Sequence, residues 1–230
     1  MLKDRVASVL GNIARVCAAI GRDPRDITLV GVTKFATAEK IIEAVEAGIC
    51  HIGENKVQEG QKKFPIVDQT GKKVTKHLIG HLQTNKVKVA VKFFDLIQSV
   101  DSLKLAQEID SQAQKLGRPY EILVQINTAH EEQKYGADPA EALSLVDTIA
   151  RLPNLKIRGL MTIAPFIDDQ TIVRQCFRDL KNIYDRVARD YAGHERVAMK
   201  ILSMGMTQDY PLALEEGSNM LRIGTAIFGE

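Results

Sequence analysis

A lysine at the end of an apolar segment is the residue of this chain best suited to covalent chemistry. Segment 27–34 is rich in β-branched residues, which predicts a buried strand with Val30, Val32 and Lys34 on one face. Lysine is rarely buried without a partner or a function. A partly desolvated amine has its nucleophilic neutral form favoured, which suits Lys34 to a Schiff base with an aldehyde. The alternative is that Lys34 only ends the strand and extends its amine into water.

Two segments near the C-terminus could bind an anion such as phosphate. Ser203, Met204 and Gly205 follow one another at the predicted end of a strand, and Gly224 and Thr225 do so at the end of the next. Each segment combines a hydroxyl group with a glycine, at which backbone N–H groups can approach an anion closely. Alternatively, both are ordinary turns in which glycine serves only the backbone geometry.

An arginine and an asparagine extend this set of polar groups. Arg222 lies two residues before Gly224 and so shares its face of the predicted strand. A buried arginine is costly unless it meets a ligand or a carboxylate, such as that of Glu215 or Glu216. Pyridoxal phosphate (PLP) enzymes place either an acid or an arginine at the pyridine nitrogen. Asn55 follows another predicted strand, where it either bonds a ring hydroxyl or caps a helix.

Eight apolar segments alternate with helical patterns along the chain, which is the pattern of a (β/α)₈ barrel of the TIM type. An open, doubly wound sheet would need a glycine-rich fingerprint after the first strand, and none follows it. The sequence therefore predicts a single barrel domain spanning 1–230, with an extra N-terminal helix. Because active sites of such barrels lie at the carboxyl ends of the strands, the candidate residues are expected to converge there. The predicted strands are 27–34, 50–53, 77–80, 96–100, 121–126, 157–162, 200–203 and 221–224. The predicted helices are 2–20, 38–47, 56–64, 82–90, 102–116, 139–152, 172–191 and 210–216.

Composition narrows the classes of protein. A formal net charge of +2 over 230 residues argues against a nucleic-acid-binding protein. Three widely spaced cysteines and five histidines show no ligand spacing, so no metal is expected. No signal peptide or membrane span is evident, so we expect a cytoplasmic protein without a membrane partner.

Six stretches together resemble the pyridoxal phosphate homeostasis protein family, which is related by fold to the N-terminal barrel of bacterial alanine racemases. They are VGVTK (30–34), HIGENKVQE (51–59), HLIGHLQTNK (77–86), GLMTIAP (159–165), LSMGMTQDY (202–210) and LRIGTAIFG (221–229). They cover nearly the whole chain in order. The resemblance implies a fold-type III PLP protein whose members buffer or deliver PLP and influence vitamin B6 and amino-acid balance, without a settled catalytic reaction.

The same resemblance implies roles for the candidate residues. Lys34 would hold PLP as a Schiff base, and Arg222 would face the pyridine nitrogen. Asn55 would lie near the ring. The phosphate would be held by Ser203, Gly224 and Thr225, assisted by the backbone around Met204 and Gly205. One departure concerns the loop after the fifth predicted strand, where Lys134-Tyr135-Gly136 carries a tyrosine at a position that is serine in many relatives.

Three functions use these residues in different ways. The first is a monomeric, non-catalytic PLP carrier whose partners are PLP and apo PLP-dependent enzymes. The second is a PLP-dependent amino-acid racemase, which needs a second base. In the alanine racemases that base is a tyrosine from an added domain, for which no residues remain here, and Tyr135 and Tyr210 are the tyrosines expected near strand ends. The third is a class I aldolase-type enzyme using Lys34 without PLP. We expect the carrier.

Overall fold

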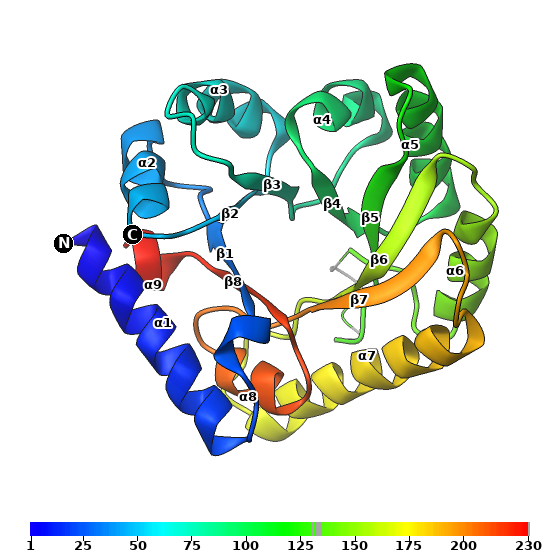
Figure 1. The fold of residues 1–230 in the computed structure, drawn as a ribbon. Coiled ribbons are helices and arrows are strands. Elements are labelled where there is room, and N and C mark those ends of the chain that lie inside the picture. Colours follow the sequence, from blue (N-terminus) through cyan, green and yellow to red (C-terminus); the bar gives the residue numbers. More distant parts are fainter. Residues whose placement is uncertain (130, 132–134, 230) are drawn as a thin grey trace.

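The strands pair in chain order and form a closed ring. A computed structural model describes residues 1–129, 131 and 135–229. Every neighbouring pair is parallel, and the ring closes because β8 pairs with β1 as well as with β7 (Figure 1). The predicted barrel is therefore confirmed. The strands are β1 Thr28–Val32, β2 His51–Glu54, β3 Thr75–Leu78, β4 Leu96–Val100, β5 Tyr120–Gln125, β6 Leu155–Met161, β7 Val197–Ser203 and β8 Met220–Ile223.

Helices follow the strands and surround the ring on the outside (Figure 1). The α-helices are α1 Leu2–Ala19, α2 Ala38–Glu46, α3 Val57–Asp68, α4 Val87–Phe93, α5 Leu103–Leu116, α6 Ala142–Ala150, α7 Gln170–Asp190, α8 Tyr210–Glu215 and α9 Thr225–Phe228. Two short 3₁₀ helices, η1 Pro24–Asp26 and η2 Thr84–Lys86, precede β1 and α4. The extra N-terminal helix α1 packs against α9, which brings the two chain ends side by side. None of the described helices is long and apolar enough to cross a membrane.

The main core lies between the outer faces of the strands and the inner faces of the helices. The amphipathic helix α1 shows how the sequence builds it, because Val6, Val9, Ile13 and Cys17 recur at helical spacing and are all buried. In the strands, alternate residues point outward into this core, among them Ile97, Ile122, Leu160 and Leu202. This layer fixes the positions of the strand ends, where the candidate residues lie.

A second, smaller apolar cluster lies inside the ring. Leu96, Leu123 and Met161, with Ile163 and Ile201 packed against them, are separate from the main core. They alternate along β4 to β7 with the outward residues, so they occupy the interior of the barrel. Bulky apolar side chains usually fill the interior of such barrels. Here the apolar side chains fill one side of the barrel interior, and hydrogen-bonded polar side chains fill the other.

The structure corrects the predicted ends of some elements. β1 ends at Val32, two residues before Lys34. The chain turns there because the N–H of Thr33 donates to the carbonyl of Gly53 and the N–H of Ala36 donates to the carbonyl of Thr33. The helix predicted at 82–90 begins as the 3₁₀ turn η2 and continues as α4. The last strand is followed directly by α9.

Candidate functional site

The candidate residues converge at the carboxyl ends of neighbouring strands. Ser203 ends β7, Arg222 lies in β8, and Gly224 precedes α9. Arg222 aligns with Val30 of β1, four residues before Lys34. The ends of β7, β8 and β1 are therefore neighbours, as the barrel fold requires.

Lys34 lies in the turn after β1 and is exposed. Its Nζ is 4.9 Å from the centroid of the Phe35 ring, and Phe35 is itself 79% exposed. The prediction that burial partly desolvates Lys34 is therefore wrong for this structure, because the strand ends two residues before it and the lysine lies in an exposed turn. The amine is instead accessible to a molecule that approaches from solvent.

Buried charged groups brace the turn that carries Lys34. The Thr33 hydroxyl donates to Glu54 Oε1 over 2.8 Å, and Lys63 Nζ donates to the same oxygen over 2.8 Å. Lys63 Nζ also donates to the backbone carbonyl of Thr33 over 3.0 Å. The side chains of Glu54 and Lys63 are only 1% and 13% exposed. Because the Thr33 peptide is held on both sides, the base of Lys34 is fixed although its amine is free to move.

Arg222 is held in the opposite way, deep in the barrel and by uncharged groups. Its side chain is 3% exposed, and its Nη1 and Nη2 donate to Ser203 Oγ over 2.6 Å and to the Thr162 carbonyl over 2.7 Å. Burial lowers the pKa of Arg222 to about 10, which leaves the guanidinium charged at neutral pH.

The alternative of an ion pair between Arg222 and the acidic end of α8 is wrong. Glu215 and Glu216 pair with Arg174 over 2.5 and 2.6 Å, and Glu216 also pairs with Arg178 over 2.9 Å. No salt bridge to Arg222 is present among the described residues. Among the described residues the guanidinium therefore has no carboxylate in direct contact, although the larger effect of burial, which lowers its pKa, is opposed by the charge of Asp209, which raises it.

Two further polar side chains inside the barrel were missed by the sequence reasoning. Gln98 of β4 and His77 of β3 are 0% and 1% exposed and bond each other, and Gln98 also bonds Ser203. A signal was present, because Gln98 interrupts the apolar segment Leu96–Val100. The two-residue period places it on the same face as Leu96, which points inward.

Close packing requires glycine at position 205 and leaves little room for a side chain at position 224. Gly205 has φ +97°, and a Cβ there would lie 2.6 Å from Ala213 Cβ. Its carbonyl accepts the N–H of Arg222 over 3.0 Å, which ties the β7 turn to β8. A Cβ on Gly224 would lie 3.3 Å from the carbonyl oxygen of Val32. Thr225 is exposed at the start of α9.

Met204, between Ser203 and Gly205, is fully buried. Its N–H donates to the carbonyl of Met220 over 3.2 Å. That N–H continues the pairing of β7 with β8 and is not directed at a ligand.

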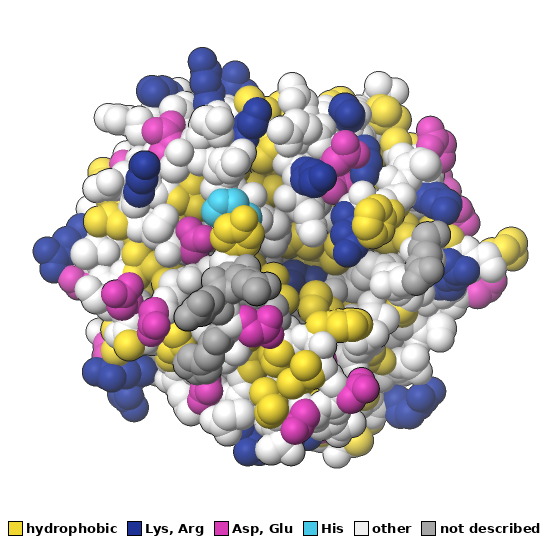
Figure 2. Space-filling view, turned by 180° about the vertical axis from the view of Figure 1, so that it is seen from behind, with side chains coloured by type: hydrophobic (Ala, Val, Ile, Leu, Met, Phe, Trp, Pro, Cys, Tyr) yellow, Lys and Arg dark blue, Asp and Glu magenta, His cyan; other side chains and the backbone are white. Residues whose placement is uncertain are grey.

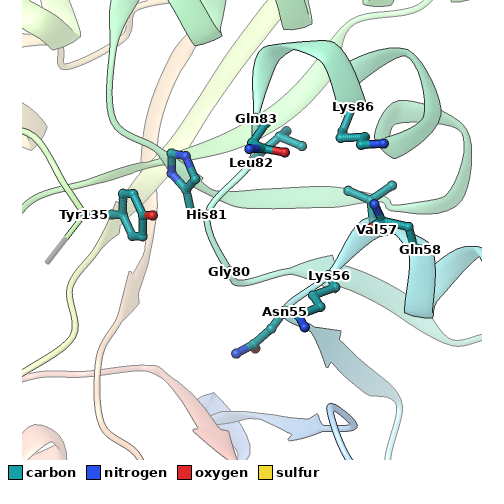
Figure 3. A pocket seen from close by; sticks show the side chains of 10 residues that line it. All are labelled: Asn55, Lys56, Val57, Gln58, Gly80, His81, Leu82, Gln83, Lys86 and Tyr135. Atoms are coloured by element: carbon teal, nitrogen blue, oxygen red, sulfur yellow. The ribbon is translucent and has the colours of Figure 1, made fainter.

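Asn55 lies beside an open pocket between the loops that follow β2 and β3. The pocket has a volume of about 650 Å³. Figure 3 shows the rings of His81 and Tyr135 side by side on one flank and Lys86 on the other; the rings stack with centroids 3.8 Å apart at 12°. The N-cap of α3 is Lys56, without a side-chain cap bond. The alternative of Asn55 as a helix cap is therefore wrong, and its exposed amide is available to a ligand.

The loop after β5 is only partly described. Lys134 lies outside the described residues. Tyr135 is 58% exposed and stacks on His81. Figure 2 shows the face opposite that of Figure 1, which is hollowed near its centre with hydrophobic side chains around the hollow. Exposed Phe35, Tyr135 and Phe166 follow β1, β5 and β6. Within the described ranges, no group of three or more histidine, cysteine or acidic side chains could hold a metal ion.

Comparison with known proteins identifies the family. The sequence model of the family described as alanine racemase, N-terminal domain, matches residues 6–230. The pyridoxal phosphate homeostasis protein of Aquifex aeolicus (strain VF5) is 38% identical over 227 residues, which cover 99% of this chain and 97% of that protein. The chain belongs to the pyridoxal phosphate homeostasis protein family. The member from Escherichia coli (strain K12) is 36% identical over 232 residues, which cover 97% of this chain and 94% of that protein.

Solved structures agree with this family and extend the fold to a wider group. PipY of Synechococcus elongatus PCC7942, solved with PLP bound, is 35% identical and superposes with a TM-score of 0.82 over 94% of this chain and 100% of its own. An alanine racemase of Clostridium difficile 630 is 19% identical, with a TM-score of 0.75 over 99% of this chain and 57% of its own. At that identity the racemase shares the barrel fold of this pyridoxal phosphate homeostasis family member.

Proposed function

We propose that this chain binds PLP and acts in intracellular PLP homeostasis, holding the cofactor for buffering or delivery. The observation that carries the proposal is Arg222, a charged group buried in the barrel whose direct contacts among the described residues are a hydroxyl and a carbonyl and not a carboxylate. Such a group is costly unless a ligand uses it. Relatives named for PLP homeostasis, and the PLP-bound PipY, support PLP as that ligand.

The residues present fit PLP. The cofactor supplies an aldehyde that bonds reversibly to a primary amine, and Lys34 presents an exposed amine at the mouth of the barrel. Arg222, which keeps its proton, can only donate to a ring nitrogen and so favours an unprotonated ring. That arrangement weakens the ring as an electron sink, but it does not by itself exclude racemisation.

The remaining site residues complete the proposed seat. Gly205 and Gly224 keep side chains away from the adjoining strand ends, where Ser203, Met204 and Thr225 also lie. We assign the phosphate to the strand ends that these five residues form, where the backbone and the hydroxyl of Thr225 would bind it. Asn55, exposed after the neighbouring strand β2, is assigned to the ring.

Two tyrosines support a carrier over the alternative, a PLP-dependent racemase. A tyrosine that acts as a base needs a pKa lowered toward neutrality. Burial instead raises the pKa of Tyr210, and Tyr135 stacks on His81. We further propose that the protein acts as a cytoplasmic monomer and passes PLP to apo PLP-dependent enzymes.

The attachment site is tested by trapping PLP on the wild-type protein. PLP is added, the visible absorption band is recorded, and borohydride reduction is followed by mass spectrometry of the digest. We expect the added mass on the peptide that contains Lys34. Lys34→Ala should lose the band, whereas Lys40→Ala, which removes another exposed lysine just along the chain, should keep it. Trapped PLP mapping mainly to another lysine would contradict the assignment of Lys34.

Carrier and enzyme are separated by two assays on the PLP-loaded protein. In the first, an apo PLP-dependent enzyme is reactivated while a second protein traps free PLP, so that delivery is distinguished from release. In the second, a panel of amino acids is tested for racemisation. We expect reactivation and no racemisation above background. Steady racemisation that depends on Lys34 would replace the carrier with the enzyme.

A further inference from the structure

A continuous chain of hydrogen bonds runs through the interior of the barrel from Arg222 to His51. Arg222 Nη1 lies 2.6 Å from Ser203 Oγ, and Ser203 Oγ lies 2.7 Å from Gln98 Oε1. Gln98 Nε2 lies 2.9 Å from His77 Nδ1, and His77 Nε2 lies 2.9 Å from His51 Nδ1. The contact between Gln98 and Ser203 spans the interior, because β5 and β6 lie between β4 and β7 in the ring.

The direction of the chain is set at both ends of Gln98. An arginine can only donate, so Ser203 Oγ accepts from Arg222 and directs its own proton to Gln98 Oε1. The amide nitrogen of Gln98 then donates to His77 Nδ1. The same amide nitrogen lies 3.2 Å from Met220 Sδ. A thioether sulfur is a weak acceptor and has no proton to donate, so it favours the amide nitrogen at this position over the amide oxygen. Each group therefore donates to the next, from the guanidinium to the histidines.

We propose that Gln98 is a positioning residue for the PLP ring site, because it holds Ser203 so that the Ser203 hydroxyl serves Arg222 and not the phosphate. This inference rests on the proposed function and refines it. The hydroxyl of Ser203 has one proton, which it donates in its hydrogen bond to Gln98. The phosphate is then left to the backbone and to the hydroxyl of Thr225.

The geometry explains why an interior glutamine is needed. Ser203 and the Thr162 carbonyl contact two different nitrogens of one planar guanidinium, and two fixed contacts on a planar group set its plane as well as its position. Without Gln98 the hydroxyl of Ser203 could rotate its proton toward the mouth of the barrel, and the lone pair that faces Arg222 would no longer be fixed. Gln98 and Ser203 are both 0% exposed, so no solvent substitutes for the lost bond.

The test compares two ligands that differ only in the phosphate, PLP and pyridoxal. Dissociation constants are measured for the wild type and for Gln98→Ala, Ser203→Ala and the double variant. We expect each single variant to weaken both ligands by the same factor, on the order of tenfold, since one buried hydrogen bond to a charged group is disturbed. The double variant should bind no more weakly than about twofold below Ser203→Ala, because the two residues act in series.

The matched control is Ser99→Ala. Ser99 is the next residue of β4, is also 0% exposed, and donates one buried bond to the Gly80 carbonyl over 2.7 Å, outside the chain of bonds from Arg222 to His51. It should leave both dissociation constants unchanged. A Ser203→Ala protein that loses affinity for PLP but not for pyridoxal would show that the hydroxyl binds the phosphate, and would overturn the inference.

A second measurement needs neither a variant nor a ligand. Nitrogen NMR of the wild-type protein reports which imidazole nitrogen of His77 carries the proton. The chain requires the proton on Nε2, with Nδ1 accepting from Gln98, and a proton on Nδ1 would overturn the inference. If the wild type binds neither PLP nor pyridoxal, the proposed function falls and this role falls with it. If it binds both and Gln98→Ala binds them equally well, only the role of Gln98 falls.

Discussion

Lys34 follows β1 and Arg222 lies in the neighbouring strand β8, yet they are supported in opposite ways. Lys34 is exposed on a turn whose base is fixed by the buried ion pair of Glu54 and Lys63. Arg222 is 3% exposed and is held by neutral hydroxyl and carbonyl groups. Charged groups therefore hold the backbone below the exposed cation, and neutral dipoles hold the buried one.

The roles proposed for the two cations account for the difference. A lysine that is to meet an incoming aldehyde has to be accessible, so only its backbone can be fixed. An arginine that is to face a bound ring has to be in place before binding, and a second charge in contact with it would weaken its effect on the ring. If this comparison is right, substitutions around Lys34 and substitutions around Arg222 should differ in how much they change stability or binding and in which of the two they change.

The largest effect is expected where the charged brace is broken on one side. Glu54→Leu removes the acceptor of both Thr33 and Lys63 and leaves the mostly buried ammonium with Glu59, 3.4 Å away, as its carboxylate partner, which should cost about 3 kcal/mol of the unfolding free energy. Urea denaturation followed by circular dichroism measures it. The double variant Glu54→Leu with Lys63→Met removes both charges and should recover most of the loss. A loss below about 1 kcal/mol in the single variant would show that the brace behaves like a surface ion pair.

A smaller effect separates charged from neutral hydrogen bonds of the same type. Thr33→Val keeps the shape of the side chain but removes its bond to the Glu54 carboxylate, and should cost about 2 kcal/mol. Thr162→Val, in the other region, removes a hydroxyl bond to the Ile126 carbonyl and the contact with the Thr128 hydroxyl, both neutral, and should cost about 1 kcal/mol. Both threonines are 0% exposed. If Thr33→Val and Thr162→Val lost equal unfolding free energy in urea denaturation, charged and neutral hydrogen bonds would not differ in strength between the two regions.

The barrel interior should also respond to acid. Burial, with the neighbouring His51, lowers the pKa of His77 from 6.5 to about 3; burial also lowers the pKa of His51, against the opposing effect of Asp95. Between pH 6.5 and about pH 3, His77 binds a proton in the unfolded state but not in the folded state, so acid favours unfolding. The unfolding free energy should fall as pH drops below about 6.5, by up to ~1.4 kcal/mol per pH unit from His77.

The pH effect is isolated by comparing two histidine variants. His77→Gln should flatten the decline between pH 6 and 5, and His81→Gln, at the exposed mouth, should leave it as in the wild type. If the unfolding free energy of His77→Gln depended on pH as in the wild type, the barrel interior would not keep His77 neutral. The description of that region as neutral would then be wrong.

The sequence predicted the barrel because its signal is local and repeated. Each strand is a short β-branched segment and each helix has its own apolar stripe, so all eight strands were located within a few residues. The end of β1 was missed because the turn at Lys34 depends on Thr33 bonding to Gly53 and Glu54 of the next strand. Such contacts join residues about twenty positions apart and leave no periodic pattern.

The site was predictable in part for the same reason. Ser203, Gly205, Arg222 and Gly224 are close in sequence to strand ends, which all barrels bring together. The bond from Ser203 to Gln98 crosses the interior between residues more than a hundred positions apart, and Gln98 then bonds His77. Strand alternation could have placed Gln98 inside, but it could not show which side chain it meets there.

The smallest effect concerns the surroundings of the exposed amine. Lys34 Nζ lies over the ring of Phe35, and such an exposed cation–π contact is worth about 0.5 kcal/mol. Phe35→Ala should therefore change the dissociation constant of PLP by about twofold. Phe166→Ala removes a ring that is also 79% exposed and lies in another loop, and it should have no effect. A Phe35→Ala variant that weakened PLP as much as Gln98→Ala would show that Lys34 depends on packed surroundings after all, and the contrast between an accessible amine and a buried guanidinium would have to be abandoned.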